Sequence, residues 1–497
     1  MKWIFFNRVT NVTVKKEEDV TRKHQQIFSH VFRRKTLWEL VRLSSIMMGI
    51  ELAYAAETSF VSPILLDIGI AHRYMTMVWS LSACLGVLCS PFIGPLTDRC
   101  HLALGRRRPL MIFLAVLLTI GLIVVPHGRR IGQWIDRGST WAIFFTILGT
   151  VMLDFGADNC QTPSRAYLLD MCLPEDHTRA LSTFSIMSGV GSFLGYIMGA
   201  FDWESLVSGD NIATVFAIAA VTLAICAVCT MTIFREIPLR VLEESSTAFP
   251  ILTSSRQSEV TQNERKKISF LTYIRSVVKM PSSIKILCLT SLFGWMSDVC
   301  YSLYFTDFVG EAVFLGDPTS DSQSSEHALY ESGVRFGCLG MAIYAFSCII
   351  FSIVMNLFLK LFRIRTILIG GSSINGLSML CLATWPTKSN VLLLSIFAGI
   401  NFAIIFTIPF ILIAQYHSTD TFKRNHDDPV AKTELHHRGL GTDIAIVNSS
   451  LFLAQIFVSL AIGCLVNLVG STSAVMYSAG VFSLLAAIVA NKVLYLD

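Results

Sequence analysis

Twelve long apolar segments are the feature that most constrains the fold of this chain. A helix needs about 20 mostly apolar residues to cross the hydrocarbon core of a membrane, and most of the segments approach that length. The first half of the chain holds six of them, at about Leu43–Leu66, Met77–Leu96, Leu110–Val125, Trp141–Asn159, Leu181–Ala200 and Ile212–Phe234. The second half holds six more, at about Ile284–Val309, Val334–Leu361, Ile367–Trp385, Val391–Gln415, Thr442–Leu468 and Ala474–Val493. We therefore predict an all-α membrane protein with about 12 transmembrane helices.

The composition agrees with this class. Of the 497 residues, 53% are hydrophobic and 15% are charged, whereas soluble proteins carry about 25% charged residues. The net charge of +4 is small, so we expect no nucleic-acid partner. Most of the 13 cysteines lie inside apolar segments and do not indicate a disulfide framework. Cys226 and Cys229 have the spacing of a metal-binding pair, but aliphatic residues surround them and a structural zinc needs four ligands.

A polar stretch rich in Ser, Thr, Glu and Lys separates the two sets of apolar segments. The predicted organisation is an N-terminal arm at 1–40, a six-helix half at 41–234, a linker at 235–281 and a second six-helix half at 282–497. Two six-helix halves joined by a linker are typical of major facilitator transporters, in which the substrate site lies at the midplane between the halves.

Lysine and arginine predict the orientation. Basic residues gather in the N-terminal arm, the linker and the turns Arg99–Arg108 and Lys360–Arg365, which all fall on one side of a twelve-helix arrangement. The positive-inside rule places these segments and both termini in the cytosol. The loop with Arg129 and Arg130 is an exception, since it falls on the outside. We expect no signal peptide, because the apolar run Trp3–Phe6 is too short for one.

The first apolar segment carries acidic residues. An ionised side chain at the bilayer centre costs about 2.5–3.5 kcal/mol on insertion scales, so each one is a candidate functional residue. Glu51, Tyr54 and Glu57 lie there within two helical turns. Glu51 either binds substrate or pairs with a neighbouring helix as a structural contact. Glu57 lies about one turn beyond Tyr54 and is predicted to face a cavity.

The fourth segment has the clearest polar pattern. Asp154, Asp158, Gln161 and Arg165 are spaced i, i+4, i+7 and i+11, which places them on one helical face. Pro163 is expected to break this helix beside protein or a water-filled cavity. A carboxylate facing such a cavity can load and release a proton. The alternative is a static buried ion pair between Asp154 and Arg165.

The seventh segment combines an aromatic residue with polar ones. Trp295, Asp298 and Ser302 share one face, and Asp307 lies near the outer end. An indole ring can stack on the apolar face of a sugar while a carboxylate and a hydroxyl bind the sugar hydroxyls. The alternative for Trp295 is a helix contact or an interfacial aromatic belt.

Other motifs argue against chemistry by this chain. The sequence lacks a nucleotide-binding glycine loop, a nucleophile elbow and a zinc-protease pair, so we expect neither an enzyme nor an ATP-driven pump. His417, His436 and His437 lack the spacing of metal ligands. Gly191, Gly195 and Gly199 recur every four residues, which favours close packing of two helices. We expect no cofactor, with the proton as the coupling ion.

Several short stretches resemble one family. The loop Gly94–Pro109, with its Gly-Arg-Arg-Arg-Pro sequence at 105–109, resembles the cytosolic loop of the glycoside–cation symporter branch of the major facilitator superfamily. The stretches Gly49–Glu57 and Phe305–Gly310, with Pro409-Phe410 and Tyr416-His417, are similar to the animal proton-associated sugar transporters. These are relatives of the plant sucrose/proton symporters. The resemblance runs from about Leu37 to the C-terminus.

The resemblance implies roles for several residues. Asp154 matches an aspartate implicated in proton coupling, and Arg165 matches the arginine that follows it. Asp307 matches a further aspartate implicated in transport. Plant relatives continue from that aspartate with Gly-Arg-Glu, whereas this chain has Gly310-Glu311-Ala312.

We therefore predict a secondary active transporter that couples protons to sucrose or a related sugar by alternating access. The predicted proton-coupling residues are Asp154, Arg165 and Glu57. The predicted substrate-binding residues are Glu51, Tyr54, Asp158, Gln161, Trp295, Asp298 and Asp307. A conformational latch is predicted at Asp98, Arg99, Arg106, Arg107 and Arg108.

The expected partners are a small sugar, protons and the lipid bilayer, and the expected state is a monomer in the plasma membrane or an intracellular vesicle membrane. One alternative is a transporter of another sugar such as glucose, or a vesicle transporter that affects lumenal pH. Another is a sugar sensor that does not transport. A long signalling tail would favour the sensor, and few residues follow Lys492.

Overall fold

The computed structural model describes residues 29–68, 72–98, 100–102, 104–135, 139–200, 211–236, 282–317, 320, 324–418 and 440–495. Most of the predicted N-terminal arm and linker lie outside these residues, as do Arg99, His436 and His437.

Long helices make up most of the described residues. Six long helices precede the gap at 237–281: α2 (Leu37–Asp67), α3 (His72–Asp98), α4 (Arg108–Ile135), α5 (Ser139–Met171), α6 (His177–Ala200) and α7 (Asn211–Thr232). Six follow it: α12 (Ser282–Phe308), α13 (Ser325–Leu361), α14 (Ile364–Thr384), α15 (Lys388–Ser418), α18 (Leu440–Val469) and α19 (Ser473–Ala490). Three short elements complete the set: the 3-10 helices η1 (Ser29–Phe32) and η2 (Pro174–Asp176) and the π-helical turn η4 (Val309–Val313).

Length and composition let ten of the described helices cross a membrane. The two long helices outside this set are α2 and α3, and α3 contains a shorter apolar stretch at Val78–Cys89. The prediction of an all-α membrane protein is confirmed, and the number of long helices agrees with the twelve predicted segments.

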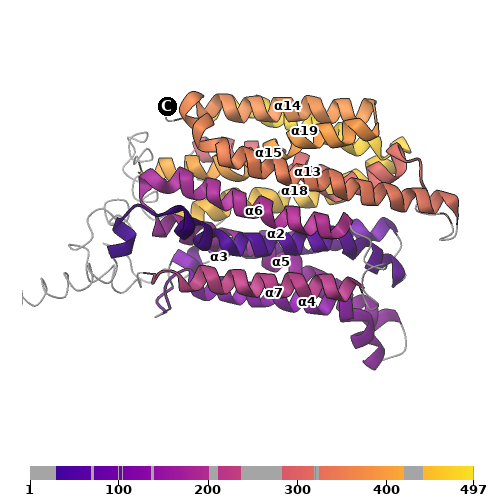
Figure 1. The fold of residues 1–497 in the computed structure, drawn as a ribbon, viewed down its shortest axis with the longest axis horizontal. Coiled ribbons are helices and arrows are strands. Elements are labelled where there is room, and N and C mark those ends of the chain that lie inside the picture. Colours follow the sequence, from indigo (N-terminus) through magenta and orange to yellow (C-terminus); the bar gives the residue numbers. More distant parts are fainter. Residues whose placement is uncertain are drawn as a thin grey trace, which may run out of the picture.

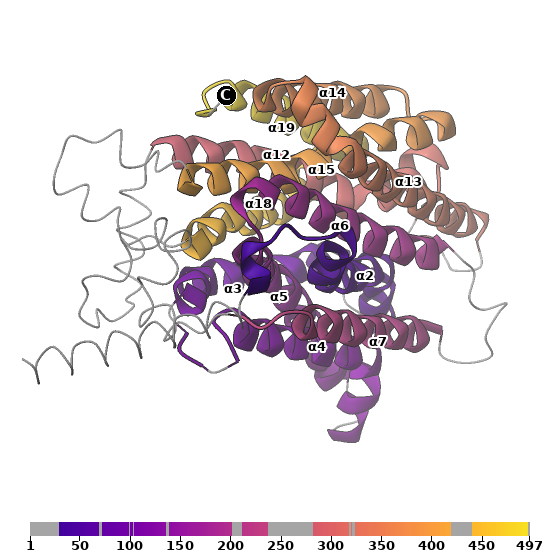
Figure 2. The same cartoon turned by 60° about the vertical axis from the view of Figure 1, so that its left-hand side comes forward.

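The helices lie side by side as two six-helix halves (Figures 1 and 2). Helices α2 to α7 form one half, and helices α12 to α19 form the other. The halves meet mainly along two helix pairs, α6 with α13 and α3 with α18, with smaller contacts of α6 with α15 and of α5 with α18. We call the end of the bundle at which α3 ends and α4 and α18 begin the basic end.

Small residues allow the helices of the first half to approach closely. Gly191, Gly195 and Gly199 all face α2, where an added Cβ would collide with Met48, Ala55 and Ser59 respectively. The prediction that this glycine repeat serves close helix packing is confirmed.

The expected break at Pro163 is wrong. Helix α5 continues through this proline to Met171. Pro163 leaves the Asn159 carbonyl without its usual intrahelical donor, and neighbouring helices let a transmembrane helix tolerate such a loss. The polar face of α5 therefore remains continuous.

We expect Gly191→Ala to destabilise the protein by about 1–3 kcal/mol, because overpacking a filled helix contact forces a shift of the backbone. Gly370→Ala in α14 is the matched control, since no atom lies within 4 Å of the added Cβ. Thermal unfolding of the purified proteins measures the difference. Equal melting temperatures for the two variants would contradict the close α2–α6 contact.

Candidate functional site

A cavity lies between the two halves, close to the middle of the helices that line it. Its empty volume, with the open solvent at its mouth included, is about 770 Å³. The lining residues are Glu51, Tyr54, Glu57, Thr58, Trp79, Asp154, Asp158, Gln161, Ser192, Tyr196, Trp295, Asp298, Val299, Ser302, Leu303, Tyr344, Phe402, Phe406, Leu451 and Gln455. Nearly all the predicted binding and coupling residues thus share one cavity.

The wall from the first half is acidic. The Tyr54 hydroxyl of α2 donates to Asp158 Oδ1 of α5. The Trp79 indole of α3 donates to Glu57 Oε1 at 3.1 Å. The second oxygens of both carboxylates, Glu57 Oε2 and Asp158 Oδ2, are buried without a hydrogen-bond partner among the described residues. Each acid therefore keeps one oxygen for a proton or a ligand.

Asp154 is held from both halves of the molecule. Its Oδ2 accepts a hydrogen bond from the Ser82 hydroxyl of α3. The same oxygen accepts one from Gln455 Nε2 of α18 at 3.2 Å. The carboxylate of Asp154 is thus joined to the opposite half through a single amide.

Arg165 lies away from Asp154, and the described ion pairs do not join them. Its guanidinium donates to Gln161 Oε1 at 3.3 Å and to Asn448 Oδ1 of α18 at 3.1 Å. It also lies over the rings of Phe406 and Phe410 on α15, at 4.1 and 4.0 Å from their centroids. Arg165 is therefore a cross-half contact on the basic side of the cavity, and the alternative of a static Asp154–Arg165 pair is wrong.

Glu51 contributes to the same wall, and its side chain is 8% exposed. Its Oε2 accepts a hydrogen bond from the Ser192 hydroxyl of α6 at 2.8 Å. This bond is the structural contact foreseen for Glu51, yet the residue also lines the cavity. The two interpretations of Glu51 are compatible.

The wall from the second half is aromatic. Trp295 of α12 packs edge-on against Phe402 and Phe406 of α15, with centroids 6.1 and 6.4 Å apart. Asp298 lies one turn from Trp295 and accepts a hydrogen bond from the Tyr344 hydroxyl at 3.0 Å. A large apolar ring surface here borders a single carboxylate.

Asp307 was predicted to bind substrate, but it is not among the described residues that line the cavity. It lies near the end of α12, where the Tyr330 hydroxyl of α13 donates to its Oδ1 at 2.7 Å. The structure therefore does not place Asp307 at the predicted sugar site.

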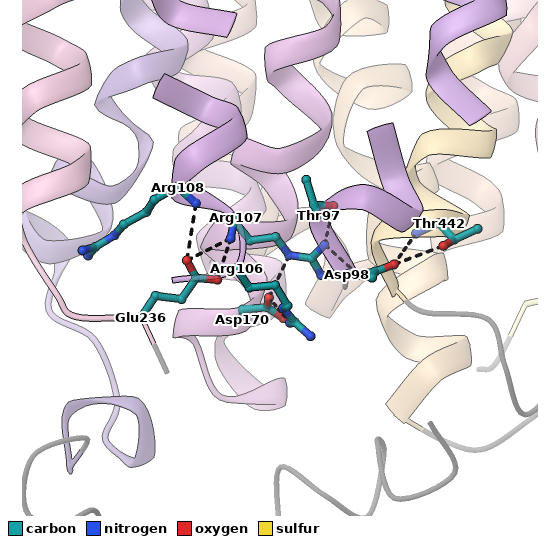
Figure 3. Close-up of polar contacts among 8 residues, drawn as sticks. All are labelled: Thr97, Asp98, Arg106, Arg107, Arg108, Asp170, Glu236 and Thr442. Atoms are coloured by element: carbon teal, nitrogen blue, oxygen red, sulfur yellow. Dashed lines mark hydrogen bonds and ion pairs between the residues drawn. The ribbon is translucent and has the colours of Figure 1, made fainter. Parts of the chain in front are cut away.

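A second cluster of charged residues lies at the basic end (Figure 3). Arg107 pairs with Asp98 at 2.6 Å and with Asp170 at 3.1 Å, and its Nη1 donates to Thr97 at 2.7 Å. Arg106 shares the same oxygen of Asp170 at 2.5 Å. These side chains tie the ends of α3 and α5 to the start of α4.

Glu236 completes this cluster from the segment after α7. Its carboxylate accepts hydrogen bonds from the backbone amides of Arg107 at 2.9 Å and Arg108 at 3.4 Å. A carboxylate in this position satisfies free amides at a helix N-terminus and favours its positive dipole end. Burial raises the pKa of Glu236, while the Arg107 amide opposes this shift.

The cluster also reaches the second half of the molecule. Asp98 Oδ2 accepts hydrogen bonds from the backbone amide and the hydroxyl of Thr442 on α18, at 3.2 and 3.1 Å. Figure 3 shows Asp98 between Arg107 and Thr442. Of the predicted latch residues, Asp98 makes this cross-half contact and Arg107 holds Asp98. Arg108 instead donates to the Tyr167 hydroxyl at 3.0 Å.

Comparisons with known proteins agree with this architecture. Residues 43–340 match the sequence profile of the Major Facilitator Superfamily. The chain belongs to this superfamily. A solved structure of the xylose transporter XylE from E. coli superposes with a TM-score of 0.59, covering 91% of this chain and 98% of that one at 15% identity.

Two curated relatives of this superfamily member span most of its length. The Membrane-associated transporter protein of Mus musculus is 31% identical and covers 93% of this chain and 95% of its own. Proton-associated sugar transporter A of Rattus norvegicus is 25% identical and covers 92% of this chain and 86% of its own. The resemblance to animal proton-associated sugar transporters, predicted from short motifs, is confirmed.

The sequence patterns of this superfamily member did not reveal several hydrogen-bond and ion-pair partners of the predicted residues. Gln455 and Asn448 lie seven residues apart in an apolar segment, and that spacing was the signal for one polar helix face. Trp79 gave no signal, because aromatic residues are common in membrane helices. Asp170 lies five residues after Arg165, the last member of the polar face of α5. Its pairing with Arg106 depends on tertiary packing, so the sequence pattern did not indicate it.

We expect Asp170→Asn to destabilise the protein by about 3–5 kcal/mol, because it leaves two buried guanidinium groups without their shared anion. Asp98→Asn is the matched control. It removes a carboxylate of the same cluster that is more exposed, and Arg107 keeps Asp170 in that variant. Chemical or thermal unfolding of both variants measures the contrast. A smaller loss for Asp170→Asn than for Asp98→Asn would contradict this account.

Proposed function

We propose that this protein is a proton-coupled symporter of sucrose or a related sugar that works by alternating access. The observation that carries the proposal is the asymmetry of the cavity, which has an acidic wall from one half and an aromatic wall from the other. Proton and substrate sites on different halves can be coupled by movement of the halves.

The aromatic wall is suited to a sugar ring. The faces of Trp295 and Phe402 offer apolar surface for the C–H faces of a pyranose or furanose. Asp298 on this wall supplies oxygens that accept hydrogen bonds from hydroxyl groups. Gln161 and Glu51 of the first half supply further oxygens from across the cavity.

The acidic wall is suited to a proton. Glu57, Asp154 and Asp158 share a buried site that contains no basic side chain among the described lining residues. Several carboxylates confined without a counter-ion repel one another, and a bound proton relieves this repulsion. We assign the coupling proton to Asp154, because its hydrogen bonds reach both halves, with Glu57 as the next candidate.

The membrane orientation is part of the proposal. The basic end carries Arg106, Arg107 and Arg108, so the positive-inside rule places it in the cytosol. The contacts of Asp98 with Thr442 and of Arg165 with Asn448 then close the cytosolic side of the cavity. The membrane is either the plasma membrane or that of an intracellular vesicle, and the protein acts as a monomer.

The names of the relatives support the same function. The rat relative is a proton-associated sugar transporter, and the superposed E. coli protein is a xylose transporter. A sensor that binds sugar without moving it is the alternative. It would show binding without uptake.

The count of carboxylates favours a second candidate, an organic cation as substrate. Five acidic residues line the cavity, and Trp295 and Tyr344 offer the ring faces that attract an ammonium group. Competition between labelled sugar and a simple amine such as putrescine distinguishes the two substrates.

We expect uptake of labelled sucrose into transporter-deficient yeast to be faster at external pH 5 than at pH 7 and to collapse with a protonophore. One pH unit supplies about 1.4 kcal/mol and 100 mV about 2.3 kcal/mol per charge, enough for roughly 500-fold accumulation at about 1.4 kcal/mol per tenfold. Glucose and trehalose tested in parallel define the sugar. Uptake that changes with neither pH nor protonophore would contradict proton coupling and indicate a uniporter.

We expect Asp154→Asn to abolish accumulation against a gradient while sparing much of the exchange of sugar down its gradient. Asparagine still accepts hydrogen bonds from Ser82 and Gln455 but cannot carry a proton. Because Arg165 does not depend on Asp154, the variant should fold normally. Asp298→Asn is the matched control on the opposite wall, where we expect weaker sugar affinity with proton dependence retained. A thermally normal Asp154→Asn protein that still concentrates sugar would move the proton site to Glu57.

A further inference from the structure

Helix α18 carries a continuous face directed at the first half of the molecule. Gly441, Asn448, Phe452, Gln455 and Ser459 are spaced i, i+7, i+11, i+14 and i+18, which keeps them on one side of a helix. This face is tightly packed. An added Cβ on Gly441 would lie 2.5 Å from Arg107 Nη1, and one on Gly86 of α3 would collide with the Phe452 ring.

Two polar members of this face, together with Thr442 at the start of the helix, contact charged residues of the first half at three levels. At the basic end, Thr442 donates to Asp98. Between that end and the cavity, Asn448 accepts from Arg165. In the cavity, Gln455 donates to Asp154. One rigid helix therefore connects the proposed proton site to the latch.

We propose that Gln455 is a positioning residue that responds to the protonation of Asp154 and, through α18, sets whether the latch at Asp98 and Thr442 is closed. This inference rests on the proposed function, which makes Asp154 the proton carrier. It adds a residue on the opposite half that converts proton binding into movement.

The direction of the effect follows from hydrogen-bond strength. An ionised carboxylate accepts a stronger hydrogen bond than a neutral carboxyl group, so an unprotonated Asp154 holds Gln455 and favours the closed latch. Protonation weakens this cross-half bond and favours opening at the basic end. The loaded carrier then opens toward the cytosol and the unloaded carrier closes again, which is the order that symport requires.

Other titratable groups surround Asp154. Those that interact with it electrostatically are Tyr54 and Glu57 on α2 and Asp158 on α5. Ser82 of α3 and Gln455 of α18, which are both uncharged, donate hydrogen bonds to Asp154. The charged residues of α4 and α6 lie at the ends of those helices. Of these acids, Asp154 has the described hydrogen bond to α18. At the basic end, Asp443 of α18 also pairs with His417 of α15 at 2.9 Å. A pH response that passes through Asp154 is lost in the Gln455 variants, whereas a response of the Asp443–His417 pair is kept.

Amide hydrogen exchange at the start of α18 tests the inference, because the Thr442 amide itself donates to Asp98. In the full-length protein, with rates corrected for intrinsic exchange, we expect protection of residues 440–447 to fall about fivefold between pH 7.5 and pH 5.5, the difference between a charged and a neutral hydrogen bond. Gln455→Leu should show the same protection at both pH values. Gln455→Met, which keeps the side-chain length, replaces it if the leucine variant does not fold.

Two further variants sharpen the result. Asp154→Asn should show the low, acid-like protection at both pH values. Ser459→Ala is the matched control on the same face, with a buried hydroxyl that has no hydrogen-bond partner, and it should keep the wild-type pH response. A wild-type response in Gln455→Leu or in Asp154→Asn, or no response in the wild type, overturns the inference.

Sugar uptake measured on the same preparations separates the two proposals. If uptake is proton-dependent but the pH response of amide protection is unchanged in the Gln455 variants, the inference is overturned and the proposed symporter is retained. A response that depends on Gln455 in a protein that moves no sugar supports the inference and overturns the symporter.

Discussion

Acidic side chains in the middle of a membrane bundle need donors, and this requirement organises the site. Each of the five acids in the cavity accepts a hydrogen bond from another helix: Glu51 from Ser192, Glu57 from Trp79, Asp154 from Ser82 and Gln455, Asp158 from Tyr54, and Asp298 from Tyr344. An unsatisfied polar group in hydrocarbon costs several kcal/mol. These bonds therefore fix how the helices of each half pack, and of the described bonds to these five acids only the one from Gln455 crosses between the halves.

This arrangement of hydrogen bonds distinguishes the rigid six-helix halves from the boundary along which they move. Inside the first half, glycine contacts such as that of Gly191 of α6 with α2 bring the helix backbones together, so the half moves as a unit. The boundary between the halves consists mainly of α6 with α13 and α3 with α18, with smaller contacts of α6 with α15 and of α5 with α18. Along it, charged groups of the first half meet neutral partners such as Thr442 and Asn448 of the second. Neutral partners make exchangeable contacts, which suits an interface that must open and close.

The sequence predicted the fold and most of the cavity because both follow from local patterns. Apolar length indicates spans, and the spacing of Asp154 and Asp158 places them on one face of α5. The partners were beyond reach, since Gln455 lies 301 residues from Asp154 and only the tertiary packing joins them. Asp307 was misplaced for a related reason. Its position near the end of α12 was visible, but its contact with Tyr330 of α13 depends on how two helices pack.

We propose that sugar and protons cross together through one cavity, whose aromatic wall stacks on the sugar and whose acidic wall carries the proton. Proteoliposomes with a pH-sensitive dye inside, no imposed pH gradient and the membrane potential clamped at zero test this coupling. An inward sucrose gradient alone should acidify the lumen, because each sugar brings protons with it, and Asp154→Asn should remove the acidification. Sucrose that enters while the lumenal pH stays constant would contradict the account.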